Sequence, residues 1–411
     1  MKILQINAIS DSGSTGRTCQ EMNEAFQTMG HSAMVAFSVG PMTDLAREYK
    51  IGSQADQRLH ALLSRITGLQ GYFSSGATRK LIAFMEDYAP DVVILRNLHA
   101  NYIHVPMLLK YLAKKDIPTV AVLHDCWFYT GKCCHYTADG CYRWQDGCGN
   151  CPAKKKYNKS WFFDRSAKML RDKKRLFQSI PRLGVVAVSR WIMQEAEKSP
   201  VLQNAVQMQQ IYNWIDTEKF RPGDGTALRE KLGIRDKKVI LSIANYWSDS
   251  KGIQTVLQVA KQLREDEAYV LVGDLPAYLD LPSNVISIPR TDDISRLVEL
   301  YSMADVFLQA SLEETFGKVT AEALSCGTPA VCFDSTANPE LIGPGCGAVV
   351  PAGDTQKMLQ QTRDILSCGK GRYTEACRRF AECKFDTKTI FARYLEFLQD
   401  IQSSSGGGVE K

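Results

Sequence analysis

The chain has 411 residues, 45% of them hydrophobic and 23% charged, with a formal net charge of +5. This length suffices for two domains with substantial cores, and the charge is too small to imply nucleic acid as a partner. No run of about 18 apolar residues predicts a transmembrane helix. The N-terminus, MKILQINAIS, is too polar after Leu4 for a signal peptide and indicates a first β-strand instead.

Strand and helix patterns alternate through the first half of the chain. The expected strands cover residues 2–6, 31–37, 91–95, 119–123 and 184–188, and the expected helices cover residues 59–69, 78–88 and 102–112. This alternation predicts a parallel sheet between layers of helices, and such sheets bind ligands at the carboxyl ends of their strands.

A glycine-rich loop, DSGSTGR at residues 11–17, follows the first strand, and we expect a helix to begin near Thr18. Such a loop can cradle a phosphate or bring a substrate against backbone N–H groups, which makes Gly13 and Gly16 candidate donor-binding residues. A plain strand–helix turn explains the two glycines equally well.

Two histidines follow expected strands, His124 after residues 119–123 and His99 after residues 91–95. An imidazole at a strand end can hydrogen-bond a sugar hydroxyl or titrate near neutral pH. His124 is a candidate for this role or for a purely structural one. For His99 the structural role is favoured.

Six of the 13 cysteines fall within residues 126–151. Without a secretion signal we expect a reducing cytosol, which disfavours a disulfide framework. The segment has few aliphatic residues and could not easily be ordered by their burial. A zinc ion bound tetrahedrally by four thiolates would stabilise its structure instead. The candidate ligands are Cys133, Cys141, Cys148 and Cys151, with Cys134 as an alternative to Cys133. Free thiols, an iron–sulfur cluster or a disulfide are the other interpretations.

The segment 154–175 combines positive charge with aromatic residues. It holds ten Lys or Arg against two Asp, and Trp161, Phe162 and Phe163 interrupt the charges. One interpretation is a basic amphipathic face that rests on anionic lipid headgroups. The other is a solvated helix whose apolar side packs in the core. Nucleic acid is not expected as a partner, because no base-reading module accompanies the charges.

A second alternating half follows, with strands expected over residues 238–244, 268–272, 284–288, 304–308 and 330–333. Lys251 comes after the first of these strands, directly before Gly252 and a helix expected over residues 253–263. A lysine at a helix N-terminus is a good partner for a diphosphate, whereas an ordinary surface lysine is the alternative.

The stretch SLEETFGKVTAEALSCGTP, residues 311–329, is the most informative part of the chain. The segment Phe316-Gly317-Lys318-Val319 starts a helix whose free N–H groups and dipole favour a phosphate, and Gly317 lets a ligand approach the backbone. Glu314 and Glu322 can accept hydrogen bonds from sugar hydroxyls. A solvated acid and an ordinary helical glutamate are the alternatives.

The residues ETFGKVTAE (314–322), followed by ALSCGTPAV (323–331), resemble the signature of retaining glycosyltransferase family 4. The resemblance implies the GT-B fold and a nucleotide-sugar donor. It also implies that Glu314 contacts the donor sugar, Glu322 the nucleotide ribose and His124 the donor hexose.

In the same family a lysine at the position of Lys251 neutralises the leaving diphosphate, together with an arginine a few residues earlier. Here Asn245 or a neighbour occupies that arginine position. Lys251 would then carry more of the role, or Arg290 would assist it. The family's segment after strand 284–288, which includes Arg290, reads the nucleobase.

We therefore predict an α/β protein with the GT-B fold: two Rossmann-like domains facing a central cleft, with a C-terminal helix crossing back to the first domain. The expected parts are an acceptor-side domain at 1–210 with a Cys-rich insertion at 126–152, a nucleotide-sugar-binding domain at 211–385, the crossing helix at 386–402 and a flexible tail at 403–411.

The resemblance implies a retaining enzyme that transfers a hexose from a nucleoside-diphosphate sugar, UDP in preference to GDP. The acceptor would be a hydroxyl of a glycan or lipid-linked glycan in surface polysaccharide biosynthesis. We expect no catalytic metal, because no Asp-x-Asp motif lies in a suitable loop, and any zinc would be structural. We expect a cytoplasmic protein, with residues 154–175 as a peripheral contact to the inner face of the membrane. The alternatives are a non-catalytic nucleotide-sugar-binding protein and a GT-B epimerase or phosphorylase.

Overall fold

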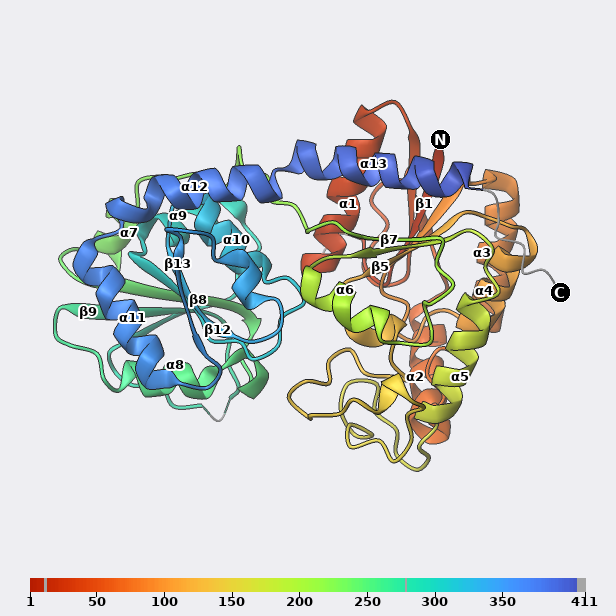
Figure 1. Cartoon of the computed structure of the whole chain (residues 1–411), viewed down its shortest axis with the longest axis horizontal. Coiled ribbons are helices and arrows are strands. Elements are labelled where there is room, and N and C mark those ends of the chain that lie inside the picture. Colours follow the sequence, from red (N-terminus) through yellow and green to blue (C-terminus); the bar gives the residue numbers. More distant parts are fainter. Residues whose placement is uncertain (11–12, 278, 405–411) are drawn as a thin grey trace. The chain divides into compact units, whose positions relative to one another are not determined.

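The computed structural model describes residues 1–10, 13–277 and 279–404. The chain forms two compact units, one of residues 1–211 together with 391–411 and one of residues 212–390. Helices surround the sheet in each unit (Figure 1). The expected tail at 403–411 lies almost entirely outside the described residues.

In its described part, the first unit is built on a seven-stranded parallel sheet with the order β3-β2-β1-β4-β5-β6-β7. Its strands are β1 Lys2–Ile6, β2 Ser32–Phe37, β3 Glu48–Lys50, β4 Val92–Leu95, β5 Thr119–Leu123, β6 Leu183–Ala187 and β7 Gln207–Gln210. The strand order reverses between β1 and β4, so the carboxyl ends of these two strands flank a topological switch point.

The helices of the first unit begin earlier or later than the sequence predicts at several places. They are α1 Gly13–Thr28, α2 Gln54–Thr67, α3 Ser75–Tyr88, α4 Val105–Lys114, α5 Ser166–Phe177 and α6 Arg190–Glu197, with short 3-10 turns η1 Cys126–Phe128 and η2 Arg143–Gln145. The expected start of α1 near Thr18 is wrong: the helix begins at Gly13, and a hydrogen bond from the Nδ2 of Asn7 to the carbonyl of Thr15 holds its first turn despite the low helix propensity of this segment. Helix α2 starts before residue 59 because Ser53 and Asp56 form a capping box.

In its described part, the second unit is built on a six-stranded parallel sheet with the order β10-β9-β8-β11-β12-β13. The strands are β8 Lys238–Tyr246, β9 Glu267–Asp274, β10 Val285–Ile288, β11 Val306–Gln309, β12 Ala330–Asp334 and β13 Gly347–Pro351. The helices are α7 Thr226–Lys231, η3 Asp249–Lys251, α8 Ile253–Ala260, α9 Ile294–Met303, α10 Lys318–Ser325, η4 Asn338–Leu341, α11 Thr355–Cys368 and α12 Gly371–Phe385. Here the switch point falls between β8 and β11.

Helix α13, Thr387–Ser403, starts in the second unit and ends in the first. A Cβ atom at Gly184 of β6 would lie 2.7 Å from Ile401 and 2.9 Å from the ring of Phe397, so only glycine lets the helix pack this closely on the sheet. The predicted return of the last helix to the first domain is confirmed.

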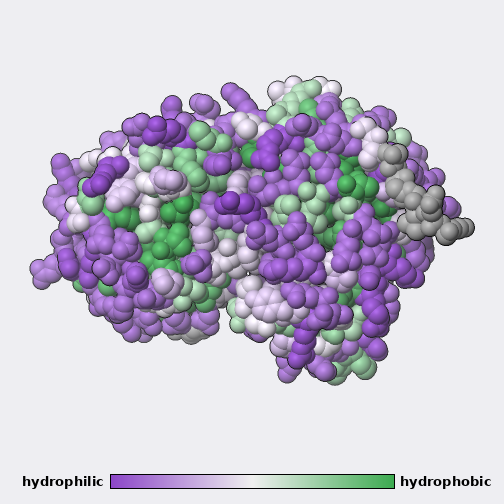
Figure 2. All heavy atoms as spheres, viewed as in Figure 1, coloured by the Kyte–Doolittle hydropathy of each residue, from purple (hydrophilic) through white to green (hydrophobic). Residues whose placement is uncertain are grey.

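Hydrophilic side chains predominate on the face shown in Figure 2, and the hydrophobic ones gather in separate patches. The strands beneath are almost wholly apolar: β4, β5 and β6 are buried along their full lengths, as expected for parallel strands covered on both faces. None of the helices in the described part of the chain combines the length and hydropathy needed to cross a bilayer.

Candidate functional site

Lys251 and Glu314 meet at the switch point of the second unit. Lys251 follows β8 and Glu314 follows β11, and these strands are hydrogen-bonded neighbours. The Nζ of Lys251 lies 2.6 Å from Oε1 of Glu314. In doubly wound sheets this crevice is where ligands bind, so two of the predicted catalytic residues lie together at the expected place.

A glycine holds the turn that carries Lys251. Gly252 has a φ of 76°, and a Cβ atom on it would lie 2.0 Å from the carbonyl oxygen of Ala310. The N–H of Leu312 donates to the carbonyl of Ser250 across the same contact, at 3.0 Å. The turn after β8 is therefore fixed against the chain that leaves β11, and this contact brings the lysine to the glutamate.

Glu314 is held through its backbone. Its N–H donates to Oγ1 of Thr336 at 2.9 Å, and its carbonyl accepts the N–H of Ala337 at 3.2 Å. Its side chain is 15% exposed, against 37% for that of Lys251. The carboxylate and the ammonium are thus accessible to a ligand while the backbone of Glu314 is anchored.

Helix α10 begins beside this pair. Gly317 precedes it with a φ of 90°, and no side chain caps the first turn. The uncapped N-terminus, with Lys318 and Val319 partly exposed, offers N–H groups and a positive dipole end to an anion. The ring of Phe316 is buried against Tyr212 and Phe385, so this residue would reach a ligand through its backbone.

The other predicted donor-binding residues of the second unit differ in burial and in their hydrogen-bond or ion-pair partners. Glu322 is 3% exposed and accepts a hydrogen bond from the Oη of Tyr301 at 2.9 Å. Asn245 is exposed at the end of β8. Arg290 follows the edge strand β10 and pairs with Asp292 at 2.8 Å. Nothing in the sequence indicated the Tyr301 contact, because the tyrosine and the glutamate belong to different helices.

In the first unit, His124 lies just after β5, as predicted. Burial, followed by the positive charge of Arg96, lowers the pKa of His124 well below its ordinary value. The imidazole is therefore neutral near pH 7. Gly13 and Gly16 fall within the first turns of α1 rather than in a loop, and residues 11–12 of the predicted loop lie outside the described part.

Sequence reasoning missed Arg96, which follows β4 at the switch point of the first unit. Its side chain is fully buried and donates to Oε1 of Gln5 and Oγ1 of Thr18, both at 2.8 Å. These bonds tie β1, α1 and β4 together. A charged residue directly after a buried apolar strand was the available signal.

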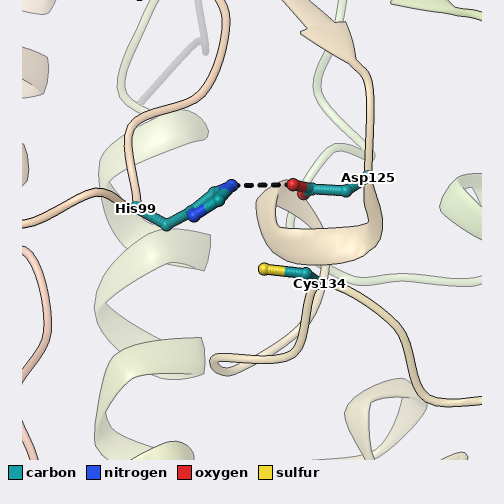
Figure 3. A group of neighbouring side chains, drawn as sticks. All are labelled: His99, Asp125 and Cys134. Atoms are coloured by element: carbon teal, nitrogen blue, oxygen red, sulfur yellow. Dashed lines mark hydrogen bonds and ion pairs between the residues drawn. The ribbon is translucent and has the colours of Figure 1, made fainter. Parts of the chain in front are cut away.

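Asp125 was also missed, although it is adjacent to His124. His99 Nε2 lies 2.7 Å from its Oδ2, and the thiol of Cys134 completes a compact group (Figure 3). Burial opposes protonation of His99, but the negative charge of Asp125 outweighs it and raises the pKa of His99 well above its ordinary value. His99 is thus a charged partner of Asp125 at the ends of β4 and β5.

The four predicted zinc ligands line one small cavity, of about 10 Å³. They are Cys133, Cys141, Cys148 and Cys151. A hydrogen bond from the Cys133 thiol lowers the pKa of Cys151 to about 7. Cys134 belongs instead to the group with His99 and Asp125. Lys132 and Arg143 line the same cavity. In the part of the chain that the structure describes, the ligand atoms close enough together to share one ion are those of His99, Asp125 and Cys134.

Two domains of this topology, each with its polar residues at a switch point, define the GT-B class of folds. A family model described as "Glycosyltransferase Family 4" matches residues 15–219, and one described as "Glycosyl transferases group 1" matches residues 224–383. The chain belongs to this family of GT-B glycosyltransferases.

Curated relatives include the N-acetyl-alpha-D-glucosaminyl L-malate synthase of Bacillus anthracis, 28% identical over 239 residues, or 54% of this chain. The D-inositol 3-phosphate glycosyltransferase of Mycobacterium sp. (strain KMS) is 27% identical over 190 residues, or 43% of this chain. The chain spans 61% and 43% of the lengths of these two relatives.

Solved structures share the fold over nearly the whole chain. Sucrose-phosphate synthase from Thermosynechococcus elongatus superposes with a TM-score of 0.71 at 15% identity, covering 98% of this chain and all of that one. HepE from Anabaena, solved in complex with UDP, superposes with a TM-score of 0.68 at 18% identity, covering 97% of this chain and all of that one. The predicted GT-B fold class is confirmed.

Proposed function

We propose that the protein is a retaining glycosyltransferase. It transfers a hexose from a nucleoside-diphosphate sugar, UDP in preference to GDP, to a hydroxyl of a glycan or lipid-linked glycan in surface polysaccharide biosynthesis. The observation that carries this proposal is the Lys251–Glu314 pair, 2.6 Å apart at the β8/β11 switch point beside the uncapped start of α10.

Each part of this arrangement has a task in the proposed reaction. The Lys251 ammonium and the N–H groups of α10 stabilise the departing diphosphate, whose negative charge grows toward the transition state. The Glu314 carboxylate accepts hydrogen bonds from the donor sugar. The neutral imidazole of His124 is assigned to the hexose, Glu322 to the ribose, and Asn245 and Arg290 to the donor nucleotide.

The bond between the anomeric carbon and the diphosphate breaks as the acceptor oxygen bonds to the same carbon on the same face. The acceptor proton passes to an oxygen of the leaving phosphate. No catalytic metal is required in this scheme, because Lys251 and the helix terminus supply the positive charge. HepE, which shares the fold, is described in complex with UDP, and this supports UDP as the donor's nucleotide.

We assign a structural zinc to Cys133, Cys141, Cys148 and Cys151. Bound there, the ion would cross-link the four thiolates and order residues 126–152, which bury few aliphatic side chains. It takes no part in the transfer.

We also propose that the first unit contacts the cytoplasmic face of the membrane. Trp161, Phe162 and Phe163 are 48%, 64% and 50% exposed. The N–H of Trp161 donates to the carbonyl of Arg65 at the end of α2, a helix that exposes Leu59 and, one turn later, Leu62. These five apolar residues form what we call the aromatic patch. Segment 154–175, which holds the three aromatic residues, also exposes several lysines and arginines, and this suits anionic headgroups.

Thermal shift with UDP- and GDP-hexoses, followed by analysis of the sugar released or transferred, tests the proposed reaction. We expect one nucleotide to raise the melting temperature and its sugar to be released slowly or transferred. If a nucleotide sugar binds but its sugar is neither released nor transferred, the protein is a binder rather than an enzyme. If Lys251→Ala and Glu314→Gln release or transfer the sugar as the parent does, the assignment of these two residues is wrong. No shift with any nucleotide contradicts the donor site itself.

A further inference from the structure

A polar cavity of about 130 Å³ lies in the first unit between the end of α2 and the loop after it, the chain after β4, and residues 157–159 of the basic segment 154–175. Its lining includes Ser64, Arg65, Gln70, Asn101, Asn158 and Lys159. One water needs roughly 10–15 Å³ by the same measure. The cavity therefore has room for a ligand group of several atoms.

The charges around this cavity are of one sign. Arg65 and Lys159 line it, and no aspartate or glutamate does so among the described residues. Neither side chain has an ion-pair partner in the part of the chain that the structure describes. Two cations without ion-pair partners that line one cavity favour an anionic ligand. A guanidinium group in particular forms paired hydrogen bonds with phosphate.

Two amide groups in the wall have unused hydrogen-bonding atoms. The Nε2 of Gln70 and the Oδ1 of Asn101 are buried and have no partner within the described residues. Gln70 is only 6% exposed. Buried polar atoms are nearly always paired in native proteins. The Nε2 of Gln70 is a donor that a bound oxyanion would satisfy, and the Oδ1 of Asn101 is an acceptor for a hydroxyl beside it.

A tryptophan connects the cavity to the strand ends. The Nε1 of Trp127 donates to Oε1 of Gln70 at 3.2 Å, and its backbone N–H donates to Oδ1 of Asp125 at 2.8 Å. Asp125 in turn pairs with His99. Gln70 is thereby oriented with its amide oxygen toward Trp127. Trp127 therefore connects a ligand bound at Gln70 to Asp125 and His99, which lie at the ends of β5 and β4.

We propose that this cavity is an oxyanion subsite that binds a phosphate group of the acceptor. This assignment rests on the proposed function, in which the second unit binds the donor nucleotide and the acceptor binds to the first unit. Arg65, Lys159 and Gln70 donate to the phosphate oxygens, and Asn101 accepts from a neighbouring hydroxyl. The adjoining aromatic patch fits a phosphate carried by a lipid, while a soluble phosphorylated sugar offers the same chemistry.

Phosphate binding can be measured without a donor, by phosphorus NMR titration of the full-length protein with inorganic phosphate. All proteins carry Lys251→Ala, which weakens phosphate binding at the candidate donor site. We expect Arg65→Gln with Lys159→Gln to weaken binding by about tenfold or more. The matched control is Arg58→Gln with Lys155→Gln, two exposed cations on the same helix and the same segment that do not line the cavity.

A third variant, Gln70→Glu, keeps the oxygen that accepts from Trp127 and replaces the donor by a carboxylate. We expect it to abolish phosphate binding while the control pair binds as the parent does. Equal binding by the parent and the Arg65/Lys159 variant, or equal losses in that variant and the control, would overturn the subsite. This titration uses no donor. If UDP-sugars cause no thermal shift, that result contradicts the proposed function but does not affect the outcome of the phosphate titration.

Vesicles of phosphatidylcholine with and without phosphatidylglycerol identify the source of the phosphate. If the Arg65/Lys159 variant loses binding to the anionic vesicles, and inorganic phosphate competes with the vesicles for the parent protein, the subsite binds a lipid headgroup. If vesicle binding is the same as in the parent while inorganic phosphate binding is lost, the subsite reads a soluble phosphorylated acceptor. Both results support the subsite.

Discussion

Lys251 and Glu314 are 63 residues apart in the chain, yet their charged atoms lie 2.6 Å apart. Each follows one of the two strands at the reversal of strand order in the second sheet. The pairing depends on a glycine, because only Gly252 lets the turn before α8 press against Ala310. A charged pair at a switch point, in a family of glycosyltransferases, is the basis for the predictions on the donor site.

Replacing Lys251 by alanine should reduce turnover by roughly 100- to 1000-fold, because the departing diphosphate loses its positively charged partner. Steady-state release or transfer of the sugar measures this. The control is Lys261→Ala, an exposed lysine of the same unit. Equal rates for the two variants would remove Lys251 from the mechanism.

Substituting Gly252 by alanine should lower the melting temperature and abolish the shift caused by the nucleotide. The added Cβ would have to displace the carbonyl of Ala310 in addition to adopting a positive φ. Gly233→Ala is the matched control, since Gly233 has a φ of 69° with nothing within 4 Å. The control should lose only about 1–2 kcal/mol, the cost of the left-handed backbone alone. If both variants lose the same stability, the contact with Ala310 does not matter.

Substituting Cys148 by serine should release zinc and lower the melting temperature, because a thiolate ligand contributes to folding free energy in structural zinc sites. Metal analysis of purified protein and a thermal melt measure both effects. Cys134→Ser should keep the zinc, because this thiol faces His99 and Asp125. Zinc that persists in the Cys148 variant, or is lost in the Cys134 variant, would contradict the assigned ligand set.

Replacing Trp161 and Phe162 by serine should reduce binding to vesicles that contain phosphatidylglycerol, while turnover on a soluble acceptor stays the same. Burying one such side chain is worth about 1.5–3 kcal/mol, so the double variant should lose at least about tenfold in affinity. Tyr246→Ser is the control, because this tyrosine is 55% exposed on the second unit. Equal effects of the control and the double variant would show that the patch does not mediate the contact.

Much of the fold could be predicted because parallel strands buried on both faces leave a strong local pattern. The runs at 119–123 and 184–188 correspond to β5 and β6, which are buried along their full lengths, with β6 beginning and ending one residue earlier than predicted. Helix ends were less predictable, since they depend on caps and packing. Serine and aspartate before residue 59 start α2 earlier than its apolar pattern indicates. In segment 154–175 the helix begins only at Ser166.

The sequence by itself determined which chemical groups follow each strand, because strand, turn and helix signals act over a few residues. The glutamate, the glycine and the helix start at residues 314–318 are an example. Only the tertiary structure decided which of these groups meet. It joined Lys251 to Glu314, buried Glu322 against Tyr301 and separated Cys133 from Cys134. Contacts between distant residues depend on how strands order and pack, and no local preference encodes that order.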